Sequence, residues 1–353
     1  MTPYKLLDWI PQCSIYWSSL SANPRAIRWL EPNLDKINWS ELSSNTEAIH
    51  ILKKNLDKID WSKLSSNTAV AAIHLLEENP DKIDWSALSS NSAAVHMLKQ
   101  NPDKIVWREL SRNTNPDAIL LFDNNFSKVK YVDWHNLCKN SNAMFLIEME
   151  WKCTKMVTWF FTWFCCCCSM KVRCMIRWSS LCANTNPAAI RILEENPEKI
   201  DWSMLSANSA AIRLIEENPE KIDWSTLSAN TAPAAIHLLE QEIRTNSHNN
   251  IRRDELSKNP GAIRILETYP DCIDWFQINE NSNPEAMRLI EVHWHKHHYI
   301  SWYMLSKNPN IFTYDYAQMK ETKNRLHEEL IRNMFHPRNM DKFEGWGIEC
   351  EWF

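Results

Sequence analysis

The sequence predicts an all-α fold, an α-solenoid in which two-helix repeats of about 22–24 residues stack on one another. Three observations predict it. Tryptophan, with 19 copies in 353 residues, recurs at near-constant spacing. The residues between successive tryptophans follow a helix-turn-helix pattern. Glycine is nearly absent, with 3 copies, so glycine-dependent turns and phosphate-binding loops have little place in this chain.

The repeat is clearest as Lys-Ile-Asp-Trp-Ser-Thr-Leu-Ser-Ala-Asn, residues 221–230. Most successive tryptophans of this pattern lie 22 or 24 residues apart, and the longer gaps measure 27, 44 and 51 residues. The gap of 51 contains a degenerate copy with Arg253 in the tryptophan position. The recurring tryptophans are Trp17, Trp39, Trp61, Trp85, Trp107, Trp134, Trp178, Trp202, Trp224, Trp275 and Trp302.

The first helix of each repeat is expected to begin after an aspartate such as Asp60 or Asp84. A carboxylate at that position accepts hydrogen bonds from the free amides of the first turn. The helix then runs through the pattern Trp-Ser-x-Leu-Ser. An asparagine ends it and caps the second helix, often with proline at the first helical position, as in Asn259-Pro260.

The second helix has the pattern Ala-Ile-x-Leu-Leu-Glu-Glu. Its apolar residues fall at i, i+1, i+3 and i+4, as in the stretch 72–76, which places them on one face of a helix. It is expected to stop at Asn-Pro, as at Asn79-Pro80, because proline cannot continue a helix. Differences in repeat length fall in the loop before this helix, which a stacked array tolerates.

A single helix pair cannot bury its own isoleucine, tryptophan and leucine, so stacking is expected to bury them in one apolar seam. Each buried indole would contribute about 2–3 kcal/mol, and its N–H would bond to a carbonyl of the neighbouring repeat. The predicted divisions are an N-terminal capping helix over 1–16, repeat arrays over 17–142 and 178–308, an atypical segment over 143–177 in place of one repeat, and a helical C-terminal cap over 309–353.

The cap contains a helix expected over about 314–335, with Leu326, Leu330, Ile331 and Met334 on one face. Open solenoid ends need caps, which favours a structural role for this helix. The alternative is a docking helix for another protein.

The repeat pattern Leu-Ser-x-Asn-x-x-Ala-Ile-x-Leu-Leu-Glu-x-Asn-Pro-x-Lys-Ile-Asp-Trp resembles short tandem repeats in proteins of giant nucleocytoplasmic large DNA viruses. Residues 308–347 resemble the C-terminal region that follows such arrays. The resemblance covers nearly the whole chain except about 143–176. It implies a viral α-solenoid protein made in an infected host cell, and it implies no biochemical activity.

The segment 143–177 loses the repeat pattern and is rich in cysteine and tryptophan. Because the tryptophan gap here is 44 residues, twice 22, we interpret the segment as one repeat that kept its length, and we favour a pair of compensating frameshifts as the cause. Its run 156–170 could touch a membrane, but it is about 15 residues long, short of the roughly 20 that span one. A zinc site is a further alternative, which four adjacent thiols fit poorly. Its candidate ligands are Cys153, Cys165, Cys166, Cys167, Cys168 and Cys174.

A variable position on the second helix is nearly always basic or histidine. Stacking would align these side chains along one face, and we call them the His/Arg row: Arg28, His50, His74, His96, Arg191, Arg213, His237, Arg264 and Arg288, with Leu120 and Phe145 in the same position of two repeats. Many have a glutamate three residues later, which predicts local ion pairs. The row is therefore either an interaction surface for an acidic partner or a neutralised, solvated face.

The cluster His293, His295, His297 and His298 admits a metal site, but a lengthened solvated loop explains it as well. No phosphate-binding loop, dinucleotide fingerprint or His-Glu-x-x-His motif is present. Serine and aspartate recur in most repeats, whereas a catalytic group need occur only once. We therefore expect no enzyme activity, no cofactor, no metal and no small-molecule substrate.

The sequence favours a protein-interaction scaffold, with a host-directed adaptor as one form of it, and it does not identify the partners. Its contact residues would be the His/Arg row and the variable position of Trp-Ser-x-Leu: Glu41, Lys63, Ala87, Glu109, Met204 and Thr226. The alternatives are a structural component of a virus particle and a nucleic-acid-binding protein that uses the row. The net charge of −5 gives no overall attraction to nucleic acid. No secretory signal is evident at the N-terminus, so an intracellular location, host cytoplasm or virion, is expected.

Overall fold

The computed structural model describes residues 4–125, 132–159, 176–246, 250–293 and 300–334. These residues form α-helices and short 3-10 turns with one small sheet, which confirms the predicted all-α repeat fold. The chain divides into two compact units, Pro11–Asn310 on the one hand and Met1–Ile10 with Ile311–Phe353 on the other.

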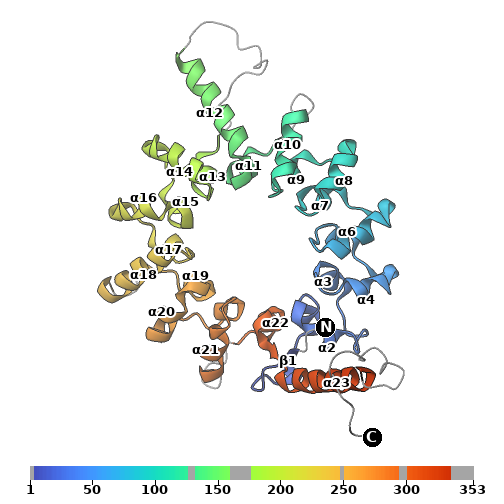
Figure 1. The fold of residues 1–353 in the computed structure, drawn as a ribbon. Coiled ribbons are helices and arrows are strands. Elements are labelled where there is room, and N and C mark those ends of the chain that lie inside the picture. The colour runs from blue at the N-terminus through green and yellow to red at the C-terminus, as the bar shows by residue number, and fades with distance from the viewer. Residues whose placement is uncertain (1–3, 126–131, 160–175, 247–249, 294–299, 335–353) are drawn as a thin grey trace, which may run out of the picture. The chain divides into compact units, whose positions relative to one another are not determined.

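The larger unit is a succession of helix pairs that follow one another along the chain (Figure 1). The first helices are α1 (Trp17–Leu20), α3 (Trp39–Ser44), α5 (Trp61–Ser65), α7 (Trp85–Ser90), α9 (Trp107–Leu110), α11 (Trp134–Lys139), α13 (Trp178–Cys182), α15 (Trp202–Ser206), α17 (Trp224–Leu227), α19 (Arg253–Lys258) and α22 (Trp302–Lys307). In one repeat a 3-10 turn, Gln277–Glu280, takes their place. The degenerate copy at Arg253 is thus confirmed as a repeat.

The second helices are α2 (Ile27–Leu30), α4 (Ile49–Lys53), α6 (Val70–Glu77), α8 (Val95–Gln100), α10 (Pro116–Asn125), α12 (Met144–Trp159), α14 (Pro187–Glu194), α16 (Ile212–Glu216), α18 (Pro233–Asn246), α20 (Ile263–Thr268) and α21 (Glu285–His293). Four of them, α6, α8, α14 and α16, end at an Asn-Pro step, after which a 3-10 turn such as Pro80–Lys82 leads to the next repeat. The predicted helix end is confirmed at these four.

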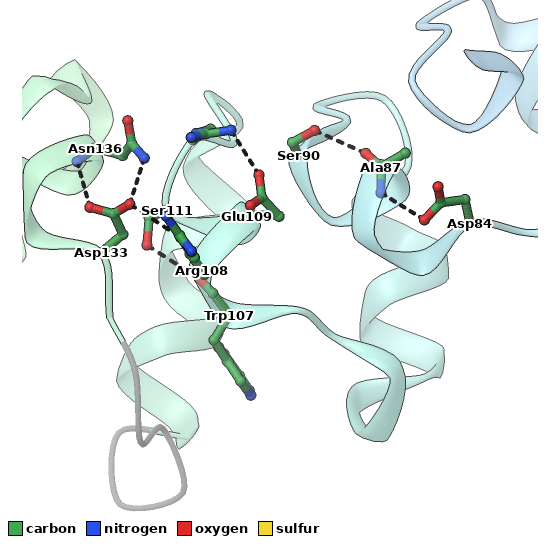
Figure 2. Close-up of polar contacts among 10 residues, drawn as sticks. Asp84, Ala87, Ser90, Trp107, Arg108, Glu109, Ser111, Asp133 and Asn136 are labelled. Carbon is green, nitrogen blue, oxygen red and sulfur yellow. Dashed lines mark hydrogen bonds and ion pairs between the residues drawn. The ribbon is translucent and has the colours of Figure 1, made fainter. Parts of the chain in front are cut away.

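The predicted N-caps are present. Asp84 accepts hydrogen bonds from the backbone N–H groups of Ser86 and Ala87, at 3.0 and 3.2 Å. Asp133 accepts from the N–H of Asn136 at 3.2 Å, and Figure 2 shows both carboxylates turned toward the start of the helix that they cap. These bonds satisfy amides that have no partner within the helix.

The core differs from the prediction in one respect, because the recurring tryptophans are half-buried and lie at its edge. The fully buried side chains are the leucine three positions after a tryptophan, such as Leu64 and Leu88 (Ile278 after Trp275), and the apolar face of the second helix, such as Ile73 and Leu76. A tryptophan at the first helical position lies beside the connecting turn. The leucine lies one turn further, where it faces the second helix.

The strongest link between repeats is a buried asparagine after each first helix. Asn91 is typical: its Nδ2 donates to the carbonyl oxygens of Ser65 and Asn67 in the preceding repeat, at 3.0 and 2.9 Å. Its Oδ1 accepts from the N–H of Ala93 at 3.0 Å and so caps the next turn. One side chain therefore ties two repeats together and orients a helix.

We call the twelve side chains that donate in this way the asparagine ladder. They are Asn23, Asn45, Asn67, Asn91, Asn113, Asn140, Asn184, Asn208, Asn230, Asn259, Asn281 and Asn308. All twelve are buried.

The second serine of Trp-Ser-x-Leu-Ser makes another link. Ser43 Oγ donates to the Trp39 carbonyl at 2.8 Å and accepts the N–H of Asp60 in the next repeat at 3.0 Å. In two repeats a cysteine replaces this serine. Cys138 and Cys182 accept the corresponding N–H through sulfur, at 3.4 and 3.3 Å.

The hydrogen bonds between repeats also join the first repeat to the last. Asn23 Nδ2 donates to the carbonyl oxygens of Ser306 and Asn308, at 3.1 Å each. The N–H of Tyr16 donates to Ser306 Oγ at 3.0 Å. We call these contacts the closing junction. The sequence predicts two open ends that need caps, whereas the first and last repeats of this unit bind each other.

The segment 143–177 does not stand in place of a separate repeat, contrary to the prediction, because its first residues form the second helix of the repeat that begins at Trp134. Asn184 donates to the carbonyl oxygens of Cys138 and Asn140, at 2.8 and 3.2 Å, so the repeats before and after the segment are direct neighbours. The residues between them form the long helix α12, and residues 160–175 lie outside those described. The tryptophan gap is therefore spanned by one lengthened repeat, and its equality with twice 22 does not indicate an extra unit.

The smaller unit contains the one sheet found among the described residues. Strand β1 (Tyr4–Leu6) pairs antiparallel with β2 (Phe312–Tyr314), with Tyr4 opposite Tyr314. The N-terminal helix predicted over 1–16 is therefore wrong, since residues 4–6 are a strand and Gln12–Ser14 a 3-10 turn. Aromatic residues in both strands favour this pairing.

Helix α23 (Tyr316–Met334) follows β2, as the sequence predicts, but none of its residues is buried. The apolar face predicted for it is exposed, with Leu326 and Leu330 each 57% exposed. The structure thus confirms the helix and shows no burial of the kind that a cap makes.

The asparagine ladder predicts a specific stability effect. Asn91→Ala removes three buried hydrogen bonds and leaves two carbonyls and one N–H without their partner. We expect it to lower the free energy of unfolding by about 3 kcal/mol. The matched control is Asn79→Ala, which removes one bond, from Nδ2 to the Leu75 carbonyl, and should cost about 1 kcal/mol. If urea-induced unfolding gives the same loss of free energy for both variants, the special role of the ladder asparagine is refuted.

The serine link gives a second prediction, at Ser89, whose Oγ donates to Trp85 and accepts from the N–H of Val106. Ser89→Ala removes the additional bond to the Trp85 carbonyl and leaves the N–H of Val106 without its acceptor, and we expect a loss of about 1–3 kcal/mol. Ser89→Cys should cost less, because Cys138 and Cys182 fill this position in other repeats. Thermal unfolding of both variants tests this, and a less stable cysteine variant would contradict it.

Candidate interaction surface

The His/Arg row lies on the second helices. Eight of its nine basic or histidine members are exposed and His50 is half-buried. The row continues through two apolar members, Leu120 on α10 and Phe145 on α12, which are 53% and 57% exposed. Met149, one turn after Phe145, is also exposed. The structure therefore places the predicted row at the surface, with a short apolar stretch inside it.

The ion pairs of the row connect neighbouring repeats. Nε2 of His50 lies 2.7 Å from Glu31 Oε1, and Arg213 pairs with Glu194. In both pairs the carboxylate belongs to the preceding repeat. The sequence predicts the local pair of Arg213 with Glu216, but the second carboxylate near this guanidinium is Glu217, at 3.8 Å.

Local pairs also occur. His74 Nδ1 lies 3.0 Å from Glu77 Oε2, as predicted, and Arg288 pairs with Glu285 at 2.9 Å. His96 of the next repeat approaches the other oxygen of Glu77, at 2.8 Å. Hydrogen bonds from His96 and then from His74 hold the pKa of Glu77 below its ordinary value. The surface is thus a mosaic of alternating charges, in which carboxylates offset many of the cations.

The variable position of Trp-Ser-x-Leu is mostly half-buried, and Lys63 is its one exposed member among the six predicted contact residues. Thr226 Oγ1 donates to the Ser203 carbonyl of the preceding repeat at 2.8 Å. Glu109 pairs with Arg112 at 3.0 Å, a contact that Figure 2 includes. Thr226 therefore takes part in stacking, and five of the six side chains are only partly available to a partner.

The capping aspartates also link repeats. Ser40 and Ser62 each donate from Oγ to the aspartate that caps the next repeat, Asp60 and Asp84, at 2.6 Å. These hydroxyl groups are the main reason that the pKa of each aspartate lies below its ordinary value. The pKa of Asp223 is lowered in the same way, mainly by its own helix residue Ser225. The serines and aspartates of the repeat thus have structural partners.

The lysine of Lys-Ile-Asp-Trp has a role that the sequence analysis missed. Lys58 Nζ lies 4.8 Å from the ring centroid of Trp39, and Lys221 lies at the same distance from Trp202. Each lysine thus covers the indole of the preceding repeat, a cation–π contact. The signal was a lysine at a fixed three positions before most tryptophans.

In the degenerate repeat both members of this contact are replaced. Where Arg253 replaces tryptophan, the lysine position of the next repeat is Cys272. A lysine there would face a second cation. Burial raises the pKa of the Cys272 thiol, and the nearby Arg253 charge opposes that rise.

The remaining candidates fall mainly outside the described residues. Met156–Trp159 of the apolar run 156–170 continue α12, and its other residues are not described, nor are Cys165–Cys168 and Cys174. In the part that is described, no helix is long and apolar enough to cross a membrane, and no group of three metal-binding side chains comes together. Of the histidine cluster, His293 ends α21, with its ring 5.2 Å from that of Trp275, while 294–299 are not described.

The fold and this surface define the molecule as an all-α repeat protein. Comparison with known proteins gives no match to a protein-family model, a curated protein or a solved structure.

The link between serine and aspartate gives a prediction for Asp84. Ser62→Ala removes the main cause of its low pKa, so that pKa should rise toward its ordinary value of about 3.9. A lowered folded-state pKa stabilises the fold above the unfolded pKa, and this contribution is lost as the pH falls through the folded value. Ser62→Ala should therefore be less stable than the parent at neutral pH, and the difference should vanish in acid.

Carboxyl NMR titration of Asp84 measures the shift directly. Ser66→Ala is the control, because Ser66 bonds to the Ser62 carbonyl and makes no contact with Asp84. An unchanged Asp84 pKa in Ser62→Ala would contradict the assignment.

Proposed function

We propose that this chain is a non-enzymatic protein-interaction scaffold whose contact surface is the His/Arg row. The observation that carries the proposal is that the repeated polar residues form hydrogen bonds within the array. The asparagine, serine and aspartate of the repeat bond to backbone or side chains of their own repeat or of a neighbouring one. The exposed positions of the second helices are the ones free to vary, as is usual for binding faces of repeat proteins.

The charges of the row favour a protein partner over nucleic acid. A phosphate backbone is bound by uncompensated cations, whose counterions are released. Here Glu31, Glu77 and Glu194 lie against members of the row, and Leu120 and Phe145 interrupt it. A protein surface with both charges and an apolar centre complements such a mosaic better than a uniform polyanion.

The resemblance of the repeat to those of giant-virus proteins supports a host-directed adaptor made during infection. The alternative, a structural component of the virus particle, is separated from it by mass spectrometry of purified particles. If peptides of this chain are abundant in the particles, the structural role is favoured and the adaptor role is rejected.

The row itself is tested by charge reversal. Arg191→Glu with Arg264→Glu changes two exposed members that make none of the ion pairs described above, so the fold should be retained. We expect quantitative capture of partners from infected cells to fall at least about fivefold, an effect of about 1 kcal/mol. The control is Lys54→Glu with Lys139→Glu, two exposed lysines outside the row, which should keep the partners.

Equal capture by both variants would overturn the row as the contact surface. The chain is also tested for binding to DNA or RNA. If it binds, if the binding weakens with salt, and if only the row variant loses it, the partner of the row is nucleic acid and not a protein.

A further inference from the structure

The closing junction uses the same hydrogen bonds as the junctions inside the array. Asn23 donates to two carbonyls of the last repeat at 3.1 Å, as Asn113 donates to the Ser89 and Asn91 carbonyls at 3.0 Å. The Tyr16 N–H binds the last serine of α22 just as the Asp60 N–H binds the serine of α3. The first and last repeats thus present the same complementary faces as two consecutive repeats of the array.

A second set of bonds reproduces another internal contact. In several repeats an asparagine two residues after the ladder asparagine donates to the preceding repeat, as Asn115 does to the Ser92 carbonyl at 2.8 Å. Arg25 holds this position in the first repeat. Its guanidinium donates to the Pro309 carbonyl at 3.2 Å and to Asn310 Oδ1 at 3.3 Å. The arginine reaches the same carbonyl position and adds one bond.

The closing junction differs from the others in one pair of side chains. Tyr16 occupies the position of the capping aspartate, and Tyr303 that of the serine which would donate to it. The two rings meet edge to face, with centroids 6.2 Å apart, and are 52% and 57% exposed. A neutral aromatic pair thus replaces a charge-assisted hydrogen bond.

The chain does not tether this junction locally. Ladder partners inside the array lie 22 to 46 residues apart along the chain, whereas Asn23 and its acceptors lie 283 and 285 residues apart. No feature of these contacts distinguishes the chain's own last repeat from that of a second copy. The cis arrangement is favoured by effective concentration, which holds only while the array brings both faces together.

We propose that the two faces of the closing junction are an interface for a second copy of this chain. In the exchanged dimer, the first repeat of each copy binds the last repeat of the other through Tyr16, Asn23 and Arg25 on one side and Ser306 and Asn308–Asn310 on the other. Such an exchange uses contacts that already exist and needs no new surface. The pairing of β1 with β2 in the smaller unit is equally free to form between copies.

The test removes one whole repeat, Asp201–Ile222, which joins Ile200 to Asp223 and restores Lys-Ile-Asp-Trp. The shortened array no longer brings its own first and last faces together in unstrained stacking. By size-exclusion chromatography with light scattering at micromolar concentration, the parent should be a monomer and the deletion variant should have twice its own monomer mass. A folded, monomeric deletion variant overturns the proposal.

The control is the same deletion with Asn23→Ala, Arg25→Ala and Ser306→Ala, which removes the junction bonds and should restore the monomer. Dimerisation that persists in this variant overturns the proposal, because another surface then carries it.

Circular dichroism reports whether the deletion variant is helical. If it does not fold, full-length chains labelled separately with donor and acceptor dyes are refolded together over a range of concentrations. Energy transfer should increase with concentration in the parent and fall at least about fivefold in the triple junction variant. Its absence at every concentration, or its persistence in that variant, overturns the proposal.

Discussion

The structure depends on one requirement, that a buried amide at each junction bonds to backbone groups of two repeats, and at most junctions to three such groups. Asparagine is the residue that meets it. Its nitrogen supplies two donors and its oxygen one acceptor, on a side chain short enough to cap the turn that begins two residues later. Aspartate has no donor when ionised, and serine has only one. Because the site is buried, a missing partner would leave carbonyl groups without hydrogen bonds, which costs more than a bond contributes.

The ladder also explains why repeat length varies while stacking does not. Asn91 and Asn113 reach acceptors 22 to 26 residues earlier, Asn140 27 and 29 residues earlier, and Asn184 44 and 46 residues earlier. In the longest case α12 keeps the buried residues of a second helix, Met144, Leu146 and Ile147, and the extra residues come after them in the chain, where added length costs little free energy per residue. A second helix can therefore be lengthened, as α12 is, without breaking the array. The same tolerance allows the first and last repeats to meet although almost the whole chain separates them.

The sequence predicts what is local and misses what depends on stacking. Helix starts at residues such as Asp84, helix ends at residues such as Asn79, and the exposed row on the second helices follow from short-range patterns. The position of the indoles does not. A tryptophan at every first helical position suggests a core, yet the buried side chain is the leucine three positions later, because the first residue of a helix lies beside the turn. The closing junction and the true nature of 143–177 were beyond prediction, since hydrogen bonds between repeats depend on how repeats stack.

Several side-chain contacts of this molecule join two adjacent repeats. At several junctions a lysine covers the indole of the preceding repeat, so two residues on different repeats act as one contact, as Lys58 and Trp39 do. Where Arg253 replaces the tryptophan, Cys272 at the lysine position avoids two like charges side by side. The ion pair between Glu77 and His96 spans a junction in the same way. Both the stability and the candidate surface therefore belong to the junctions, and an isolated repeat would present neither.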